Sequence, residues 1–298
     1  MKKDTLIPVL SRFGLVATTI IWGFAFVVVK NSLDYITPMY ILALRFSIAG
    51  VLLGLIYFKK LKKINKKTFI QGVWIGVFLF LAYVLQTVGL VYTTAGKNAF
   101  LTTIYVMIVP FIHWIISKKR PDSYSLAAAV IAMIGVGLIS LNSDFSVNIG
   151  DFLTLLCGFA FAMQIVLINR YTEQSDPILL TVLQLLTAAV LSWIIAPITE
   201  GGFPIQGLRW ETVTAVMYLG IFSTLIGFLL QTVCQKYLPP TTASLLLSFE
   251  SVFGVLFSVL FLAEQISLKT GVGCLLMFFA VILSETKLSF RKKATLTI

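Results

Sequence analysis

The chain alternates between long apolar stretches and short polar connections. A helix needs about 17–25 apolar residues to cross roughly 30 Å of hydrocarbon, and ten stretches reach this length. They lie near residues 13–30, 38–58, 69–91, 98–117, 124–141, 150–169, 177–198, 212–234, 242–263 and 267–284. The first stretch lacks the small-residue exit of a cleaved signal peptide and leads directly into a second span. The pattern therefore predicts an all-α membrane protein with ten transmembrane helices.

Short motifs recur in the same order in the two halves of the chain. Leu85-Gln86-Thr87-Val88 returns as Leu230-Gln231-Thr232-Val233, Gly23-Phe24-Ala25-Phe26 as Gly158-Phe159-Ala160-Phe161, and Pro38 with Arg45 as Pro177 with Gln184. The offsets are 145, 135 and 139 residues. Each half holds five predicted spans, and this odd number inverts the second copy relative to the first. We therefore predict two inverted five-helix repeats, residues 1–143 and 144–298, an organisation typical of transporters.

Composition and charge agree with a membrane location. The chain is 58% hydrophobic and only 12% charged, with a mean hydropathy of +0.97, so it has too little polar surface for a water-soluble globule. Its net charge of +11 comes from Lys and Arg at predicted membrane edges, mostly on one side. This bias predicts a multi-pass protein of the plasma membrane with both termini cytoplasmic. It also argues against a nucleic-acid partner.

Several motifs resemble the EamA family of the drug/metabolite transporter superfamily. They are Trp22-Gly23, Arg45-Phe46, the stretch Ala95 to Ala99, and Glu264 after the ninth span. The resemblance covers nearly the whole chain and implies a central cavity lined mostly by helices 1–4 and 6–9, with helices 5 and 10 peripheral. It also implies export or exchange of small metabolites, often amino acids. One departure is Glu250-Ser251, where members of the family often have Glu-Pro.

Two charged residues lie well inside predicted spans, where a charge is costly and therefore tends to face a cavity or a partner. Arg45 is about seven residues into the second span, and Glu250 about eight residues into the ninth. Arg45 is a candidate receptor for a substrate carboxylate, and Glu250 is a candidate carrier of a coupling proton. The alternative is that both are structural, paired with each other or with helix ends.

Aromatic and amide side chains form a second group of candidate substrate ligands. Tyr83 and Gln86 are three residues apart and share one helix face, and Gln231 is the repeat equivalent of Gln86. Trp22 lies deep in the first span. These side chains either line the cavity or hold helices together, because buried amides contribute roughly 0.6–2 kcal/mol to helix association.

The fourth span carries a further polar pattern. Asn98, Thr102 and Tyr105 follow i, i+4, i+7 spacing, which predicts one polar stripe on a continuous helix. Lys97 beside it either receives an anion at the cavity mouth or belongs to a capped helix start. Pro110 removes a backbone hydrogen bond and is a candidate hinge.

The same residues argue against an enzyme or a pump driven by ATP. A Gly-x-x-x-x-Gly-Lys-Ser/Thr run is absent, and three unpaired cysteines with one histidine give no metal framework; we expect no cofactor. The prediction is a secondary transporter that moves a small-molecule substrate, most simply exporting amino acids or related metabolites by alternating access. Multidrug efflux and flipping of a lipid-linked sugar are the alternatives. The expected surroundings are the lipid bilayer, and the oligomeric state stays open between a monomer and a homodimer.

Overall fold

The computed structural model describes residues 3–118, 123–140, 148–207 and 209–286, and all regular structure in these ranges is helical. In chain order the helices of the first half are α1 (Lys3–Ser32), α2 (Pro38–Ile56), α3 (Phe58–Leu61), α4 (Lys66–Tyr92), α5 (Ala95–Thr102), α6 (Tyr105–Ser117) and α7 (Ser123–Ser140). Those of the second half are α8 (Ile149–Thr172), α9 (Pro177–Thr199), the 3-10 turn Ile205–Gly207, α10 (Trp210–Met217), the π-helix Tyr218–Ile226, α11 (Gly227–Gln235), α12 (Pro240–Leu262) and α13 (Leu268–Thr286). The all-α prediction is confirmed.

Within the described residues, eight helical segments are long and apolar enough to cross a membrane, with mean hydropathies of 1.9–2.3. They are α1, α2, α4, α5 with α6, α8, α9, α10 through α11, and α12. The other two predicted spans correspond to α7 and α13, which contain shorter apolar stretches, Val130–Ile139 and Leu268–Ala280. The predicted boundary between residues 143 and 144 lies outside the described residues.

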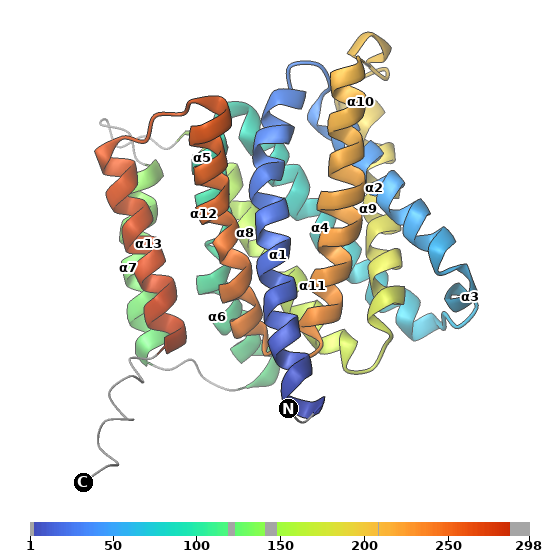
Figure 1. Cartoon of the computed structure of the whole chain (residues 1–298), viewed down its shortest axis with the longest axis horizontal. Helices are drawn as coiled ribbons and strands as arrows, with labels where there is room; N and C mark the ends of the chain where they lie inside the picture. Colours follow the sequence, from blue (N-terminus) through green and yellow to red (C-terminus); the bar gives the residue numbers. More distant parts are fainter. Residues whose placement is uncertain (1–2, 119–122, 141–147, 208, 287–298) are drawn as a thin grey trace.

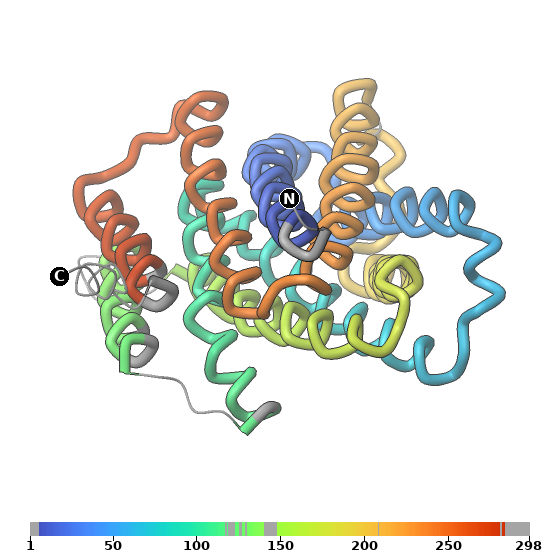
Figure 2. Tube along the Cα trace, turned by 60° about the horizontal axis from the view of Figure 1, so that its bottom comes forward, coloured from blue at the N-terminus to red at the C-terminus, as the bar shows by residue number. Residues whose placement is uncertain are grey.

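Long helices pack side by side into one bundle (Figure 1). The closest partners are α1 with α12, α2 with α9, and α4 with both α8 and α9. Helices α7 and α13 pack on each other at one edge of the bundle, and both views show this pair away from α2 and α9 (Figures 1 and 2). Their place agrees with the peripheral position expected for the fifth and tenth helices.

Carboxylates cap two of the helices that begin with proline, α2 and α9. Pro38 and Pro177 occupy the first turns of α2 and α9, where the missing N–H costs no hydrogen bond. Asp176 accepts the Ile178 N–H at 2.8 Å, whereas Glu200, just after α9, accepts the Met39 N–H at 2.9 Å. Each negative charge therefore lies at a positive helix end, and the Glu200 contact ties the start of α2 to the end of α9.

The predicted fourth helix, 98–117, is interrupted. Thr103 N–H donates to the Phe100 carbonyl and Ile104 N–H to the Leu101 carbonyl, both at 3.2 Å. These three-residue bonds mark a tighter turn between α5 and α6. The Thr103 hydroxyl also donates to the Phe100 carbonyl, at 2.7 Å, and such local bonds compete with a regular helix. The prediction of a continuous helix was wrong here, because the apolar pattern does not register a one-turn break.

The predicted eighth helix, 212–234, is also irregular. Its central part, Tyr218–Ile226, is a π-helix. Extended π-helical turns are rare, and they tend to occur at functional sites. The sequence predicted a plain helix, because its apolar pattern is the same in both geometries.

Candidate functional site

A central cavity lies where helices of both halves meet. Its walls come from α1, α2, α4, α6, α8, the π-helix, α11 and α12, and they leave about 540 Å³ between their atoms, open solvent included. The expectation of a central cavity is met, but the seventh predicted span, α9, contributes none of its lining residues. The lining comprises Trp22, Ala25, Phe26, Val29, Arg45, Tyr83, Gln86, Thr87, Leu90, Tyr105, Phe161, Ile165, Ser223, Gln231, Leu247 and Glu250.

Arg45 is held in the cavity wall by hydroxyl groups of the π-helix. Its side chain is 2% exposed; Nε donates to Thr224 Oγ1 and Nη2 to Ser223 Oγ, both at 2.8 Å. The guanidinium carbon lies 4.7 Å from the centre of the Tyr83 ring, a cation–π geometry. A guanidinium has five N–H donors, so donors remain for an acceptor in the cavity.

Arg45 and Glu250 do not form an ion pair. Lys60 pairs with Asp176 and Lys97 with Asp151, whereas Arg45 has the hydroxyl partners given above. Glu250 is 5% exposed, and its Oε1 accepts the Tyr105 hydroxyl at 3.0 Å. Two ionisable side chains of opposite type, from α2 and α12, therefore line one cavity, and each is hydrogen-bonded to neutral hydroxyl groups.

Trp22 and Tyr83 form an aromatic wall beside Arg45. The indole N–H of Trp22 donates to the Ser223 carbonyl at 2.8 Å, within the π-helix. Phe228 lies 5.1 Å from Trp22 and 5.8 Å from Tyr83, measured between ring centres. The wall thus presents apolar rings to the cavity, and Trp22 also links α1 to the π-helix through its hydrogen bond to Ser223.

Gln86 and Gln231 both line the cavity, but their amides are also engaged elsewhere. Gln86 donates to Thr102 Oγ1 at 3.1 Å. Gln231 exchanges hydrogen bonds with Gln164 at 3.2 and 3.3 Å, and Gln164 donates to Gln184 at 3.2 Å. The sequence left two alternatives for these glutamines, lining the cavity or holding helices together. In the structure each glutamine does both.

Asn98 and Thr102 depart from the predicted stripe. Both are fully buried and neither lines the cavity, whereas Tyr105 does. The turn between α5 and α6 separates Thr102 from Tyr105, so the spacing on a continuous helix does not apply. The Asn98 amide donates to the Gln86 carbonyl at 3.1 Å and to Thr154 Oγ1 at 2.8 Å. In this structure Asn98 and Thr102 support the cavity wall from behind.

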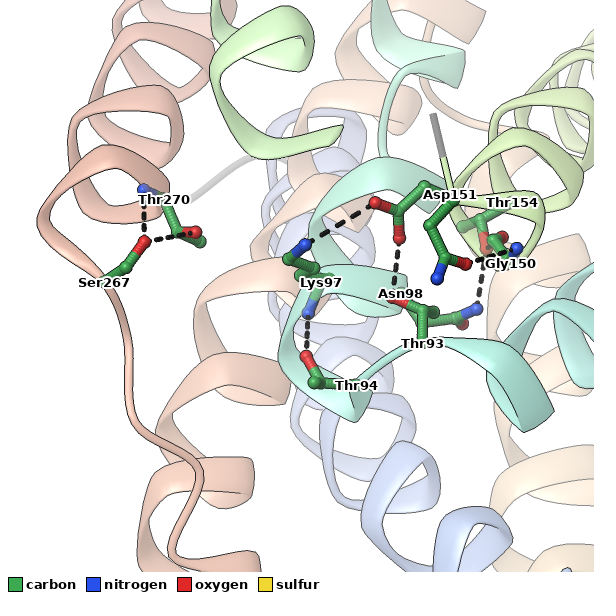
Figure 3. A network of polar contacts seen from close by, with 10 residues as sticks. Thr93, Thr94, Lys97, Asn98, Gly150, Asp151, Thr154, Ser267 and Thr270 are labelled. Carbon is green, nitrogen blue, oxygen red and sulfur yellow. Dashed lines mark hydrogen bonds and ion pairs between the residues drawn. The ribbon is translucent and has the colours of Figure 1, made fainter. Parts of the chain in front are cut away.

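Lys97 belongs to a polar network at one end of the bundle (Figure 3). Its ammonium lies 3.6 Å from Oδ2 of Asp151, a side chain with no exposed surface, and Thr93 donates to the other carboxylate oxygen at 2.5 Å. Thr94 caps α5 by accepting the Lys97 N–H. Lys97 therefore lies in a capped helix start, which is one of the two alternatives that the sequence offered for it.

Glu264 and Pro110 also have defined places. Glu264 accepts the N–H groups of Ala95 at 2.7 Å and Gly96 at 3.0 Å, so the end of α12 caps the start of α5. Pro110 lies inside α6, two turns beyond the interruption of the fourth span. The structure interrupts this span at Thr103 and Ile104, whereas Pro110 lies within a helix. A hinge at Pro110 stays a prediction.

The sequence patterns did not predict a role in the cavity for Ser223, Thr224 or Phe161. Ser223 and Thr224 are adjacent hydroxyl residues in the middle of a predicted span, a polar signal that deserved the same weight as Gln231. Phe161 lines the cavity as part of the second Gly-Phe-Ala-Phe motif, which the sequence marked only as a repeat. In the described residues no three His, Cys, Asp or Glu side chains are grouped to hold a metal ion.

Comparisons with known proteins agree with this architecture. The profile of the EamA-like transporter family matches residues 11–141 and 148–286. An uncharacterized transporter of Archaeoglobus fulgidus is 35% identical over 270 residues, covering 91% of this chain and 84% of the relative. The uncharacterized transporter YoaV of Bacillus subtilis is 25% identical, covering 94% and 98%. A solved crystal structure, 16% identical, superposes with a TM-score of 0.68 over 95% of this chain and 98% of its own. With most of its length matched by the family profile and eight candidate membrane spans, the chain is a multi-pass membrane protein that belongs to the EamA-like transporter family.

Proposed function

We propose that this protein is a secondary transporter that exports amino acids or related zwitterionic metabolites across the plasma membrane by alternating access. The observation that carries the proposal is Arg45, a buried guanidinium that faces the cavity and has only hydroxyl partners. A buried charge without a counter-ion is costly, and a substrate carboxylate would supply the missing charge in bidentate geometry. Glu250, facing the same cavity from α12, would receive the substrate ammonium.

Equivalent contacts in the two halves support the proposed inverted duplication. Lys30, near the end of α1, donates to the carbonyls of Leu90 and Thr93, both at 2.8 Å, where α4 ends. Asn169, near the end of α8, donates in the same way to the carbonyls of Gln235 at 3.4 Å and Leu238 at 3.0 Å, where α11 ends. Leu90 and Gln235 are 145 residues apart, and so are Thr93 and Leu238. The same offset relates Gln86 to Gln231.

The helix pairings support the same interpretation. If α1, α2, α4, α5–α6 and α7 correspond to α8, α9, α10–α11, α12 and α13, then the contacts α2 with α9, α5 with α12 and α7 with α13 each join equivalent elements. The contact of α4 with α8 corresponds to that of α11 with α1. Two similar halves that meet at one cavity can exchange conformations, and this opens the cavity first to one side and then to the other.

Counterflow in proteoliposomes tests the substrate class. Vesicles are loaded with a mixture of unlabelled amino acids, and the accumulation of each labelled amino acid from outside is followed. We expect saturable accumulation of one or a few amino acids, and its loss in Arg45→Gln. Arg170→Gln is the matched control, because it removes the same charge from an exposed position. If the folded wild-type protein accumulates no amino acid, the proposed substrate class is wrong.

The role of Glu250 has its own test. Among the residues that the structure describes, Glu250 is the only carboxylate that lines the cavity, and we therefore assign it the coupling proton. Imposing a pH gradient should drive net transport by the wild-type protein. Glu250→Gln should exchange substrate more weakly, because it loses the charge that would bind the ammonium, and its remaining exchange should not respond to the gradient. An unchanged response in Glu250→Gln would remove Glu250 from the coupling mechanism.

The aromatic lining supports a second candidate, efflux of amphipathic cations. Trp22, Tyr83 and Phe161 present ring surfaces to the cavity, and aromatic faces attract cations. Arg45 opposes this candidate, because a buried positive charge repels a cationic drug. Direct binding of lipophilic cations, with affinity that rises in Arg45→Gln, would favour drug efflux over amino-acid export.

A further inference from the structure

A second hollow lies away from the central cavity, on the side of the bundle where α1 and α10 lie next to each other (Figure 1). This groove has a volume of about 360 Å³, within the range of small-molecule sites. Its lining comprises Phe24, Val28, Asn31 and Ser32 of α1, Tyr35, Glu211, Thr212, Thr214 and Ala215 of α10, and Tyr218 of the π-helix. It shares none of these residues with the central cavity.

The groove has an apolar end and a polar end. Phe24, Val28 and Tyr218 lie toward the middle of their spans, whereas Asn31 and Glu211 lie where α1 ends and α10 begins. Neighbouring apolar side chains that point outward include Ile20 at 43%, Met217 at 43% and Phe222 at 49% exposure. A face of this kind in a membrane bundle contacts lipid, and Trp210, at 77% exposure next to Glu211, is typical of the membrane–water interface.

The polar end holds one buried hydroxyl that lacks a hydrogen-bond partner among the described residues. Thr212 is 2% exposed, lines the groove, and its hydroxyl oxygen has no hydrogen-bond partner among the described residues. A buried polar atom of this kind is uncommon, because leaving it unpaired costs free energy. The exposed Glu211 carries a negative charge at the same end. Arg209 lies nearby, with its guanidinium carbon 5.2 Å from the centre of the Tyr35 ring.

We propose that this groove binds one membrane phospholipid whose headgroup carries a protonated amine. An acyl chain fits along Phe24, Val28 and Tyr218, and the headgroup lies at the interface beside Trp210. The ammonium group would bind Glu211, since a primary ammonium has three N–H donors. Arg209 would contact the phosphate, and the Thr212 hydroxyl would donate to a phosphate or ester oxygen. The apolar end of the groove would thus hold the acyl chain, and its charged end would hold the headgroup.

The bound lipid would contact the element that holds Arg45. Tyr218 is the first residue of the π-helix, its ring lies 5.3 Å from Phe24, and its hydroxyl donates to the Ile21 carbonyl at 2.9 Å. Ser223, which binds Arg45, lies five residues further along the same π-helix. An occupant of the groove therefore packs against both α1 and the π-helix, at the seam between the two halves of the chain.

Native mass spectrometry of the detergent-purified protein tests the proposal without a transport assay. The protein is mixed in turn with phospholipids of identical acyl chains and ethanolamine, choline or glycerol headgroups, and the fraction that retains one lipid is measured. We expect preferential retention of the ethanolamine lipid, because choline has no N–H donor and glycerol has no positive charge.

Two variants and one control locate the site. Glu211→Gln should weaken retention of the ethanolamine lipid by about tenfold and remove the preference, because hydrogen bonds to charged groups are the stronger ones. Thr212→Val should weaken retention of all three lipids about fivefold, a size typical of one lost hydrogen bond. Thr199→Val, an equally isosteric change at the exposed end of α9, should have no effect. Equal retention of the three lipids by the wild-type protein, or wild-type retention by both groove variants, would overturn the proposal.

Discussion

The close approach of α1 and α12 at Gly23 allows a quantitative prediction about one wall of the cavity. A β-carbon at Gly23 would lie 2.8 Å from the carbonyl carbon of Phe253 and 2.9 Å from the backbone nitrogen of Gly254. It would also overlap the β-carbon of Phe253. Non-bonded carbon atoms prefer separations of about 3.5–4.0 Å. Gly23→Ala therefore requires the two helix backbones to move apart.

The size of the effect follows from this geometry. Overpacking of a well-packed interior costs about 1–3 kcal/mol, and the upper end applies because the obstructing atoms belong to backbone. Alanine is about 1 kcal/mol better than glycine in a helix, which offsets part of the loss. The expected net loss for Gly23→Ala is thus about 2 kcal/mol. Gly54→Ala is the matched control, since the nearest atom to its new β-carbon is Val182 Cγ1 at 3.9 Å, an ordinary contact.

Thermal unfolding in detergent measures the difference. Cys157 and Cys234 are buried, so a thiol-reactive fluorophore reports their exposure as the bundle unfolds. Gly23→Ala should unfold several degrees below the wild type, whereas Gly54→Ala should unfold at the wild-type temperature or slightly above it. An unfolding temperature of Gly23→Ala equal to that of Gly54→Ala would refute the argument, because it would mean that the two helices separate at no cost.

Three further predictions concern single contacts. Burial alone would raise the pKa of Asp176, but the hydrogen bond from Lys60 and the N-terminal N–H groups of α9 lower it below its ordinary value. Asp176→Asn should therefore destabilise the protein at neutral pH. The stability difference between the wild type and the variant should shrink as the pH falls through the lowered pKa, because the side chain at position 176 is then neutral in both proteins. Trp22→Phe keeps the aromatic wall but removes the donor to the Ser223 carbonyl, so we expect faster hydrogen exchange in the π-helix, with unchanged exchange there as the contrary result. Asn169→Ala leaves the carbonyls of Gln235, at the end of α11, and of Leu238, just after it, without their donor. It should lower the unfolding temperature by an amount equivalent to about 1 kcal/mol; no decrease would mean that water replaces the amide.

Much of the architecture was predictable because hydrophobic length and helix-start signals are local. The bounds of α2 and α9 follow from proline at the first helical position, and both starts were predicted correctly to the residue. The position of Arg45 and Glu250 facing the cavity follows from the cost of burying a charge in hydrocarbon. Their roles in transport stay predictions, because position alone does not establish binding.

The parts that were not predicted depend on contacts between distant segments. The π-helix accepts the Trp22 indole N–H from a residue 201 positions earlier, and no local pattern of α10 or α11 marks this bond. Asn98 reaches Thr154 across 56 positions, so its direction could not be read from its own helix. Arg45 likewise donates to Ser223 and forms no ion pair with Glu250, because α2 packs against the π-helix.

The offset between the two halves bears on how the cavity works. Glu250 accepts its hydrogen bond from Tyr105, a residue 145 positions earlier, and this is the offset that relates Gln86 to Gln231. On the proposed duplication, Tyr105 and Glu250 are thus equivalent positions that meet across the pseudo-symmetry axis. Equivalent positions with different chemistry make the cavity asymmetric, because the member from the first half is a phenol and the member from the second half is a carboxyl group. An exchange of conformations between the halves would then move the phenol and the carboxyl group in opposite senses, so the proposed proton coupling would run through the second half alone.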